Sequence, residues 1–141
     1  HEVTMCQEEV KVNGVKGHID AMIDGELVDV KSASPYGFRK FHNGSLKNDD
    51  PFGYIYQISS YAKALKKDAG YFLAVDKSNG FMTLLKTDVT DVNPEERIDQ
   101  LRKTLSDKEP PEKCYQPTEE ANGNKKLAIG CKFCDFIFIV I

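Results

Sequence analysis

Three charged residues, Asp20, Asp29 and Lys31, lie in segments that otherwise alternate between polar and apolar residues like β-strands. The stretch reads "GVKGHIDAMIDGELVDVKSAS", and its Asp24-Gly25 dipeptide favours a two-residue type I′ hairpin turn. Counting outward from that turn places Asp20 directly opposite Asp29 on the neighbouring strand. Because side chains alternate along a strand, Lys31 lies on the same face as Asp29. The sequence therefore predicts two carboxylates and an ammonium group on one face of a sheet.

Two acids that face each other across a hairpin repel, which costs roughly 0.2–1 kcal/mol when the pair is exposed. A bound cation would reverse that cost, and Mg²⁺ prefers one or two carboxylates together with waters and phosphate oxygens. Lys31 could then orient or help to deprotonate a water, or stabilise charge on a phosphate in the transition state. The alternative is a solvated strand face on which Lys31 forms an ordinary ion pair with Asp29.

The same counting, extended through the Asn13-Gly14 turn, divides three predicted strands within residues 3–34 into two faces. The polar face is predicted to hold Gln7, Glu9, Lys11, His18, Asp20, Met22, Leu27, Asp29 and Lys31. The apolar face, which we expect to form the core, holds Val10, Val12, Val15, Gly17, Ile19, Ala21, Ile23, Val28 and Val30. A slip of one residue would exchange the two faces, so the pattern specifies the register.

The remaining elements follow from turn residues and hydrophobic spacing. Residues 34–50 are rich in Gly, Asn, Ser and Lys and predict a loop. An Asp-Pro cap and helical apolar spacing predict a helix of about four turns over residues 51–65. A second hairpin is expected over residues 70–88, with enough apolar residues on both faces to be covered by helices, and a capped helix begins after Asn93. We therefore predict an α/β fold in which a central mixed sheet is flanked by helices.

At 141 residues the chain is long enough for one domain with its own core. We assign residues 1–106 to that core and residues 107–141 to an irregular, cysteine-containing tail packed on the same domain. The net charge of −3 argues against a generic basic nucleic-acid coat, although a metal-dependent nuclease can be acidic because its cation offsets the carboxylates. No apolar stretch approaches the ~20 residues of a membrane span and no signal-peptide pattern opens the sequence, so we expect a cytoplasmic protein.

The stretch "GHIDAMIDGELVDVKSAS" resembles the core of the PD-(D/E)XK nuclease superfamily, and "QISSYAKAL" resembles the Gln-x-x-x-Tyr helix of its RecB-like branch. That branch includes phage exonucleases and CRISPR-associated RecB-like nucleases. The resemblance implies a restriction-endonuclease-like core, a Mg²⁺- or Mn²⁺-dependent exonuclease activity on DNA, and the cytoplasm of a bacterial or phage-infected cell. It makes Asp20, Asp29 and the Val30 carbonyl metal ligands, Lys31 the catalytic lysine, and Gln57 and Tyr61 a helix pair that lines the active site. Glu9 and His18 on the predicted polar face are further candidate metal ligands.

The four cysteines include a C-terminal CxxC pair, a spacing typical of metal or cluster sites in a chain without export signals. The tail resembles that of iron–sulfur nucleases of the same branch, which hold a [4Fe–4S] cluster with one distant Cys and a Cys-x₂-Cys-x₅-Cys set. Cys131 and Cys134 match that set, and Val140 stands where its third cysteine would fall. A complete cluster would then need Cys114, in an irregular segment, and Cys6, in a predicted strand. Alternatives are a Zn²⁺ site from the same residues, or reduced thiols without a metal.

We expect Arg39 and Lys40 to contact DNA phosphates, and aromatic residues of the 34–50 loop to stack on bases. These aromatic residues are Tyr36, Phe38 and Phe41, and further candidate phosphate contacts are Lys11, Lys16, Lys47, Lys63, Lys66 and Lys67. Two other functions remain open. One is a structure-selective endonuclease with the same core, and the other is a catalytically incomplete nucleic-acid-binding or assembly module with a metal-stabilised tail.

Overall fold

The structure is a computed structural model that describes residues 1–107 and 118–126. The chain divides into two compact units, His1–Arg102 and Lys103–Ile141, and the boundary falls within helix α3 (Pro94–Ser106). In the second unit the described residues include a short hairpin, β8 (Thr118–Glu119) and β9 (Lys125–Lys126), within the predicted irregular tail. All candidate site residues that the structure describes belong to the first unit.

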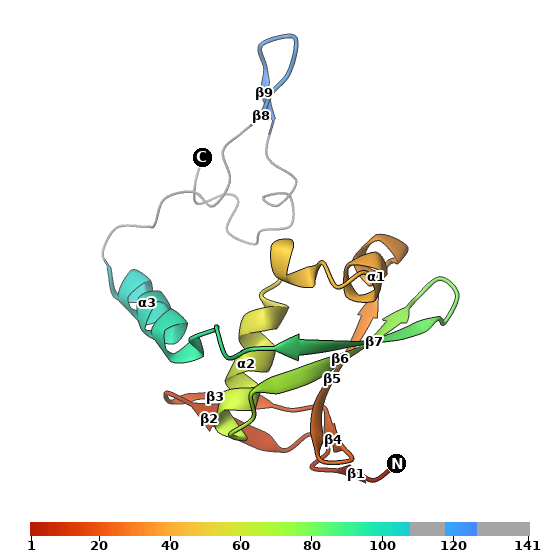
Figure 1. The fold of residues 1–141 in the computed structure, drawn as a ribbon. Helices are drawn as coiled ribbons and strands as arrows, with labels where there is room; N and C mark the ends of the chain where they lie inside the picture. Colours follow the sequence, from red (N-terminus) through yellow and green to blue (C-terminus); the bar gives the residue numbers. More distant parts are fainter. Residues whose placement is uncertain (108–117, 127–141) are drawn as a thin grey trace. The chain divides into compact units, whose positions relative to one another are not determined.

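A mixed five-stranded sheet forms the centre of the first unit, with its strands in the order β1-β4-β5-β6-β7 (Figure 1). These strands are β1 (Val3–Thr4), β4 (Ala21–Ile23), β5 (Glu26–Ala33), β6 (Ala69–Asp76) and β7 (Met82–Asp88). Strands β5 and β6 are parallel, and the other neighbours are antiparallel. A parallel pair needs a crossover connection, which α1 (Pro35–His42), a 3₁₀ turn (Leu46–Asn48) and α2 (Tyr54–Ala64) provide. The predicted α/β fold with a central mixed sheet is confirmed.

The two predicted hairpin turns have the expected backbone conformation. Both residues have positive φ in Asn13-Gly14 (44° and 80°) and in Asp24-Gly25 (51° and 78°), as a type I′ turn requires. The second turn sets the predicted register, with Ile23 opposite Glu26. The sequence-based counting from these turns is therefore valid within each hairpin.

The first predicted strand is interrupted between β1 and β2 (Glu9–Val12). Met5 and Gln7 have positive φ values of 50° and 56°, so the chain turns there instead of continuing as a strand. Strand β2 pairs with β3 (Val15–His18) in a two-stranded sheet that is separate from the central one. Cys6, which was predicted to lie in a strand, lies in this turn and is exposed.

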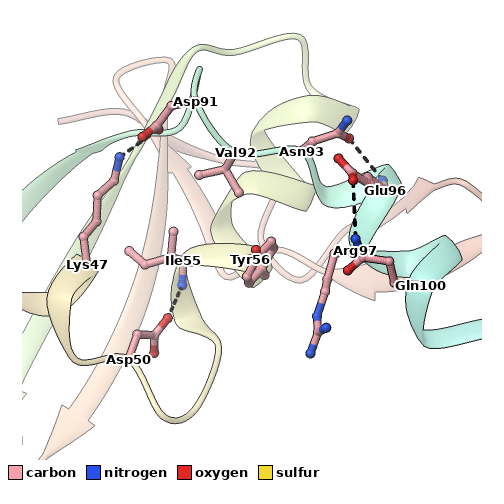
Figure 2. Close-up of a pocket in the computed structure, with 10 residues that line it drawn as sticks. All are labelled: Lys47, Asp50, Ile55, Tyr56, Asp91, Val92, Asn93, Glu96, Arg97 and Gln100. Carbon is pink, nitrogen blue, oxygen red and sulfur yellow. Dashed lines mark hydrogen bonds and ion pairs between the residues drawn. The ribbon is translucent and has the colours of Figure 1, made fainter. Parts of the chain in front are cut away.

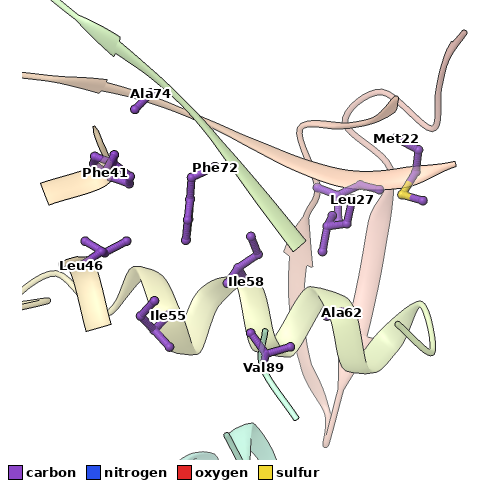
Figure 3. Packing of buried hydrophobic residues seen from close by; sticks show 11 residues of the cluster. Met22, Leu27, Phe41, Leu46, Ile55, Ile58, Ala62, Phe72, Ala74 and Val89 are labelled. Carbon is purple, nitrogen blue, oxygen red and sulfur yellow. The ribbon is translucent and has the colours of Figure 1, made fainter. Parts of the chain in front are cut away.

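The hydrophobic core lies between one face of the sheet and the crossover helices (Figure 3). Helix α2 buries Ile55, Ile58 and Ala62 in a cluster that also contains Leu27 of β5 and Phe72 of β6. Each of these five residues is at most 8% exposed. Apolar burial at roughly 25 cal/mol per Å² is the main contribution that holds the helix against the sheet.

The predicted core face is wrong for most of strands β4 and β5. Met22, Leu27 and Asp29, which we assigned to the polar face, are 6%, 0% and 2% exposed. On the predicted core face Val28 is buried, at 5%, but Val30 is 46% exposed. The face that carries Val30 also leaves Leu84 of β7 60% exposed, so the helices of the described chain cover one face of the sheet rather than both. Alternation determines which side chains share a face, but it does not determine on which face the crossover helices pack.

Residues 35–42 form helix α1 where a loop was predicted. The Oγ of Ser34 caps the helix by accepting a 3.3 Å hydrogen bond from the Gly37 N–H, and Pro35 is the first helical residue. Because of this helix, Phe41 is turned into the core and is 3% exposed. Phe38 is partly buried against the same core. The prediction that Phe41 stacks on DNA bases is therefore wrong.

Helix α2 begins at Tyr54, three residues after Pro51. Gly53, at a φ of 73°, precedes the helix, and the Asp50 carboxylate accepts hydrogen bonds from the N–H groups of Tyr54 and Ile55 at 3.0 and 2.8 Å. The predicted start of the helix, with Asp50 as the cap and Pro51 as the first helical residue, is therefore wrong, because Gly53 is the N-cap. The Asp50 carboxylate nevertheless binds the first two N–H groups of the helix. The helix has 11 residues, which is about three turns instead of four.

The second hairpin and the last predicted helix are confirmed. Strands β6 and β7 pair antiparallel, and α3 begins at Pro94. The Oδ1 of Asn93 accepts a 3.1 Å hydrogen bond from the Glu96 N–H, which is the predicted cap. Among the residues that the structure describes, no helix is long and apolar enough to cross a membrane.

Candidate active site

Strand β5 places Asp29 and Lys31 on the face that the helices cover. The Lys31 Nζ lies 2.7 Å from the Asp29 Oδ2, and the two side chains are only 16% and 3% exposed. The predicted shared face of these residues is confirmed. The pair is not the solvated surface ion pair that the alternative interpretation required, because water reaches little of either side chain.

Burial raises the pKa of the Asp29 carboxyl above its ordinary value, because the charged form loses hydration. The hydrogen-bonding and charge interactions of Lys31 act in the opposite direction, and the nearby negative charge of Asp20 adds to the increase. The two acids are therefore close enough to interact electrostatically, although the β4–β5 ladder ends at Ala21 and Val28 and does not include the predicted Asp20–Asp29 pair. Such an arrangement destabilises the ionised carboxylate unless a further positive charge is present.

Asp20 lies just before β4 and binds the backbone of β5. Its Oδ2 accepts a 2.6 Å hydrogen bond from the Val30 N–H, and its Oδ1 accepts a 3.2 Å bond from the Gln7 Nε2. The N–H and C=O of one strand residue point to the same edge, so the Val30 carbonyl lies on the side of Asp20. The structure thus brings Asp20, Asp29 and the Val30 carbonyl to one end of β4.

Helix α2 supplies the next two predicted residues. The Lys31 Nζ donates a 2.8 Å hydrogen bond to the Gln57 Oε1, and the Gln57 Nε2 donates a 3.2 Å bond to the Tyr61 hydroxyl. Gln57 and Tyr61 are four residues apart and share one helix face. A continuous chain of polar contacts therefore runs from Asp29 through Lys31 and Gln57 to Tyr61.

The lack of a side chain at Gly17 of β3 makes room for Tyr61, the last residue in this series of polar contacts. A Cβ atom at Gly17 would lie 2.7 Å from Cε1 and 3.1 Å from the hydroxyl oxygen of Tyr61. The Tyr61 ring therefore packs directly on the β3 backbone. The sequence motif contains this glycine, and the structure gives the physical reason for it at this position.

The carboxylates fit a hydrated divalent cation. The Asp29 Oδ2 is buried and has no partner with hydrogen-bond geometry besides its ion pair with Lys31, so lone pairs remain for a cation. No group of three His, Cys, Asp or Glu side chains in the described ranges is arranged to hold a metal ion. A divalent cation here would therefore be held by at most two carboxylates and by waters, an arrangement that Mg²⁺ accepts, and its binding stays a prediction.

Glu9 and His18 are opposite each other on β2 and β3, as predicted. However, the Glu9 carboxylate pairs with the Lys16 Nζ at 2.9 Å, on the separate two-stranded sheet. The predicted continuous polar face, which would have joined Glu9 to Asp20 and Asp29, is therefore broken where β3 ends. The roles of Glu9 and His18 as metal ligands stay predictions.

Lys31 lines a pocket of about 250 Å³ that extends towards helix α1. The other lining residues include Lys40, Phe52, Tyr54 and Lys77. Gln57 and Tyr61 line a second hollow of about 180 Å³ together with Gly17. The series of polar contacts from Lys31 to Tyr61 therefore has a hollow at each end. A bound molecule could reach Lys31 in one hollow and Tyr61 in the other.

The residues predicted to contact DNA lie on α1, not on a loop. Tyr36 is 63% exposed, with the Arg39 guanidinium 5.8 Å and the Lys40 ammonium 5.2 Å from its ring centroid. The Lys40 Nζ also pairs with the Asp49 carboxylate at 2.7 Å. Tyr36 and Arg39 are therefore exposed, whereas the Lys40 side chain is only 15% exposed and already has an acidic partner. The contacts of these residues with DNA stay a prediction.

Three of the four cysteines, Cys114, Cys131 and Cys134, lie outside the described residues. The predicted cluster or zinc site therefore stays a prediction.

The residue that sequence analysis missed is Tyr54. The Lys31 Nζ lies 4.8 Å from the centroid of its ring, within the range of a cation–π interaction. Tyr54 precedes Gln57 by three residues, so helical spacing places the two side chains on neighbouring parts of one face. That spacing was the available signal, but it could not indicate that Lys31 would lie above the ring.

A larger hollow of about 560 Å³ lies between α2, the loop after β7 and α3 (Figure 2). Tyr56, Arg97 and the Lys47–Asp91 ion pair line it. Lys31, Gln57 and Tyr61 do not, so it is separate from the candidate active site.

No protein-family model matches the chain, and no curated protein matches it. A solved structure, the crystal structure of SSO0001, is similar with a TM-score of 0.51 and 13% sequence identity. The similarity covers 99% of this chain and 60% of the SSO0001 chain, so this chain spans less than two thirds of that protein. At this identity the likeness concerns the fold alone.

Proposed function

We propose that the chain is a metal-dependent DNA nuclease of the RecB-like PD-(D/E)XK type, acting as an exonuclease. The observation that carries the proposal is the position of the Lys31 ammonium, 2.7 Å from Asp29 and 2.8 Å from Gln57. These residues come from two motifs far apart in the sequence, and they meet at one part-buried lysine near a second acid, Asp20. An incidental surface pair would not account for this convergence, because exposed ion pairs contribute little and need no buried partners.

In this proposal each residue has a distinct task. Asp20, Asp29 and the Val30 carbonyl hold Mg²⁺ or Mn²⁺, which when bound would activate water and neutralise phosphate charge. Lys31 presents an ammonium group to the phosphate or to the attacking water. Gln57 accepts a hydrogen bond from that ammonium and links it to Tyr61. Arg39, Lys40 and Tyr36 of α1 contact the DNA outside the reacting centre.

The proposal extends to the tail, where Cys114, Cys131, Cys134 and Cys6 would hold a [4Fe–4S] cluster or, alternatively, Zn²⁺. An absorption spectrum and iron analysis of anaerobically purified protein test this part independently of DNA cleavage. Iron with a broad visible absorption supports the cluster. A colourless sample without iron or zinc would contradict both forms.

A second candidate function is a non-catalytic nucleic-acid-binding or assembly module. The observation that favours it is that no third acidic or His ligand joins Asp20 and Asp29 within the described residues. The buried Asp29 charge favours the enzyme, because a module with no need for a cation would be more stable with an apolar residue there.

Digestion of end-labelled DNA tests the proposal and separates its forms. Linear and covalently closed circular DNA, each single- and double-stranded, are incubated with Mg²⁺, Mn²⁺ or a chelator. Release of nucleotides from linear DNA only, abolished by the chelator, is the expected result. Cleavage of circular DNA would instead indicate the structure-selective endonuclease, and metal-independent or absent cleavage would contradict the proposed nuclease.

A further inference from the structure

Tyr54 is a neighbour of the Lys31 ammonium that the sequence motifs do not account for. Asp29 lies 2.7 Å and Gln57 2.8 Å from the Lys31 Nζ, and the Tyr54 ring centroid lies at 4.8 Å. We propose that Tyr54 is a positioning residue, whose ring holds the Lys31 ammonium in the orientation that the reaction uses. The catalytic consequence rests on the proposed nuclease function, whereas the contact itself does not.

The start of helix α2 holds the Tyr54 backbone in place. Tyr54 is the first residue of the helix, and its N–H donates a 3.0 Å hydrogen bond to the Asp50 carboxylate. The other carboxylate oxygen of Asp50 accepts from the Ile55 N–H at 2.8 Å. One acid therefore fixes two successive N–H groups, and the direction in which the Tyr54 side chain leaves the helix is determined.

Aromatic side chains pack around the Tyr54 ring. Its centroid lies 6.1 Å from that of Phe41 and 6.4 Å from that of Phe72, which are 3% and 0% exposed. Phe52 lies 5.5 Å away on the exposed side and is itself 76% exposed. The packing of the ring against the core restricts its movement. The ring can therefore restrict the movement of the Lys31 ammonium that contacts it.

Lys31 needs such support because its side chain is long and flexible. A lysine loses substantial rotamer entropy when its ammonium is held in one place, and an ammonium is a compact charge with no preferred plane. On the pocket side, the hollow of about 250 Å³ beside Lys31 gives the ammonium room to move. The Tyr54 face limits that movement, because its negative quadrupole attracts the cation without replacing either hydrogen-bond partner.

A purely structural role for Tyr54 would have different consequences. Removal of the ring would then lower stability but leave the local environment and the reactivity of Lys31 unchanged. The phenol hydroxyl is not part of the described contact, so phenylalanine should substitute for tyrosine. Tyr56, two residues along the same helix and 46% exposed, interacts with Arg97 at 5.9 Å instead, and it provides a matched control.

The direct test is an NMR measurement of the Lys31 side chain in protein with isotope-labelled lysine, with Lys31→Arg used for assignment. Protons above an aromatic ring resonate upfield, so the ε-protons of Lys31 should lie upfield of those of other lysines in the wild type. Tyr54→Phe and Tyr56→Leu should keep that shift and Tyr54→Leu should lose it. An ordinary Lys31 shift in the wild type, which needs no variant to fold, would overturn the proposal, and so would a shift that persists in folded Tyr54→Leu.

Cleavage kinetics provide the second measurement. Tyr54→Leu should lower kcat about ten-fold with little change in KM, and Tyr54→Phe and Tyr56→Leu should remain close to the wild type. Equal kcat in folded Tyr54→Leu and wild type would overturn the positioning role. If the wild type does not cleave DNA, the nuclease proposal fails. The chemical shifts of the Lys31 ε-protons still test the contact between Lys31 and the Tyr54 ring.

Discussion

The ammonium of Lys31 donates a 2.8 Å hydrogen bond to the amide oxygen of Gln57, and this contact joins strand β5 to helix α2 across the candidate site. The Gln57 amide nitrogen then donates to the Tyr61 hydroxyl at 3.2 Å. One amide therefore holds both neighbours, and its loss would remove one acceptor from the part-buried Lys31 ammonium and one donor from the Tyr61 hydroxyl.

Gln57→Ala should consequently reduce DNA cleavage at least about ten-fold while lowering the free energy of unfolding by about 1 kcal/mol, the usual contribution of a hydrogen bond. Chemical denaturation and initial cleavage rates measure the two effects. Gln100→Ala is the control, because Gln100 lies on helix α3 and its Nε2 donates a 3.3 Å hydrogen bond to the Glu96 Oε1 instead of to a residue of the site. Equal cleavage by both variants would contradict a role of Gln57 in the site.

Gly17→Ala should destabilise the protein by about 1–3 kcal/mol, because the new methyl group would lie 2.7 Å from the Tyr61 ring. Thermal denaturation of both single variants and of the double variant with Tyr61→Leu measures the coupling. The Gly17→Ala change should cost much less once the ring is gone. Additive effects would show that the Tyr61 ring is not what excludes a side chain at Gly17.

Asp76 should contribute to stability in a pH-dependent way. Hydrogen bonds from the Ser78 hydroxyl at 2.7 Å and the Ser78 N–H at 2.9 Å lower the pKa of its carboxyl. Because the folded pKa is depressed, the contribution is complete above the unfolded value of about 3.9 and disappears as pH falls through the folded pKa. The stability difference between wild type and Asp76→Asn should therefore shrink below about pH 4. A difference that grows on acidification would contradict this account.

Mg²⁺ should stabilise the wild type against heat and should not stabilise Asp29→Asn. A ligand at about 100 times its Kd adds about 2.7 kcal/mol to the folded state. Thermal melts with Mg²⁺ and with chelator measure this effect without any requirement for activity. Asp91→Asn, which removes an exposed acid paired with Lys47, should keep the wild-type response. An equal response of Asp29→Asn would remove Asp29 from the metal site.

Turn residues and side-chain spacing predicted the relative positions of the site residues within each hairpin and helix. They did not predict how the elements around the site pack. The Asp24-Gly25 turn correctly determined which residues of β4 and β5 face each other, because hairpin register depends on the turn and on alternation alone. The positions of Gln57 and Tyr61 on one helix followed from their spacing. Their contact with Lys31 depends on where the crossover helix packs, and only the family resemblance supplied that step.

The errors arose where tertiary packing decides the outcome. Helix α1 was not predicted, because the Gly- and Asn-rich composition of residues 34–50 favours a loop. Ser34 and Pro35, which are the cap and the first residue of the helix, were the local signal for it. The buried position of Phe41 depends on that helix. The contact of Lys31 with Tyr54 involves two elements whose relative position is not encoded in a local pattern.

The most direct test of the central claim compares DNA cleavage by the wild type, Lys31→Ala and Lys86→Ala in Mg²⁺. Lys86 is an exposed lysine of strand β7 whose ammonium lies 5.7 Å from the centroid of the Tyr71 ring, and it is not among the predicted DNA contacts. We predict that Lys31→Ala remains folded, as judged by its circular dichroism, and loses cleavage by at least a hundred-fold, whereas Lys86→Ala stays within a few-fold of the wild type. Full cleavage by Lys31→Ala would contradict the assignment of this part-buried lysine as the catalytic group.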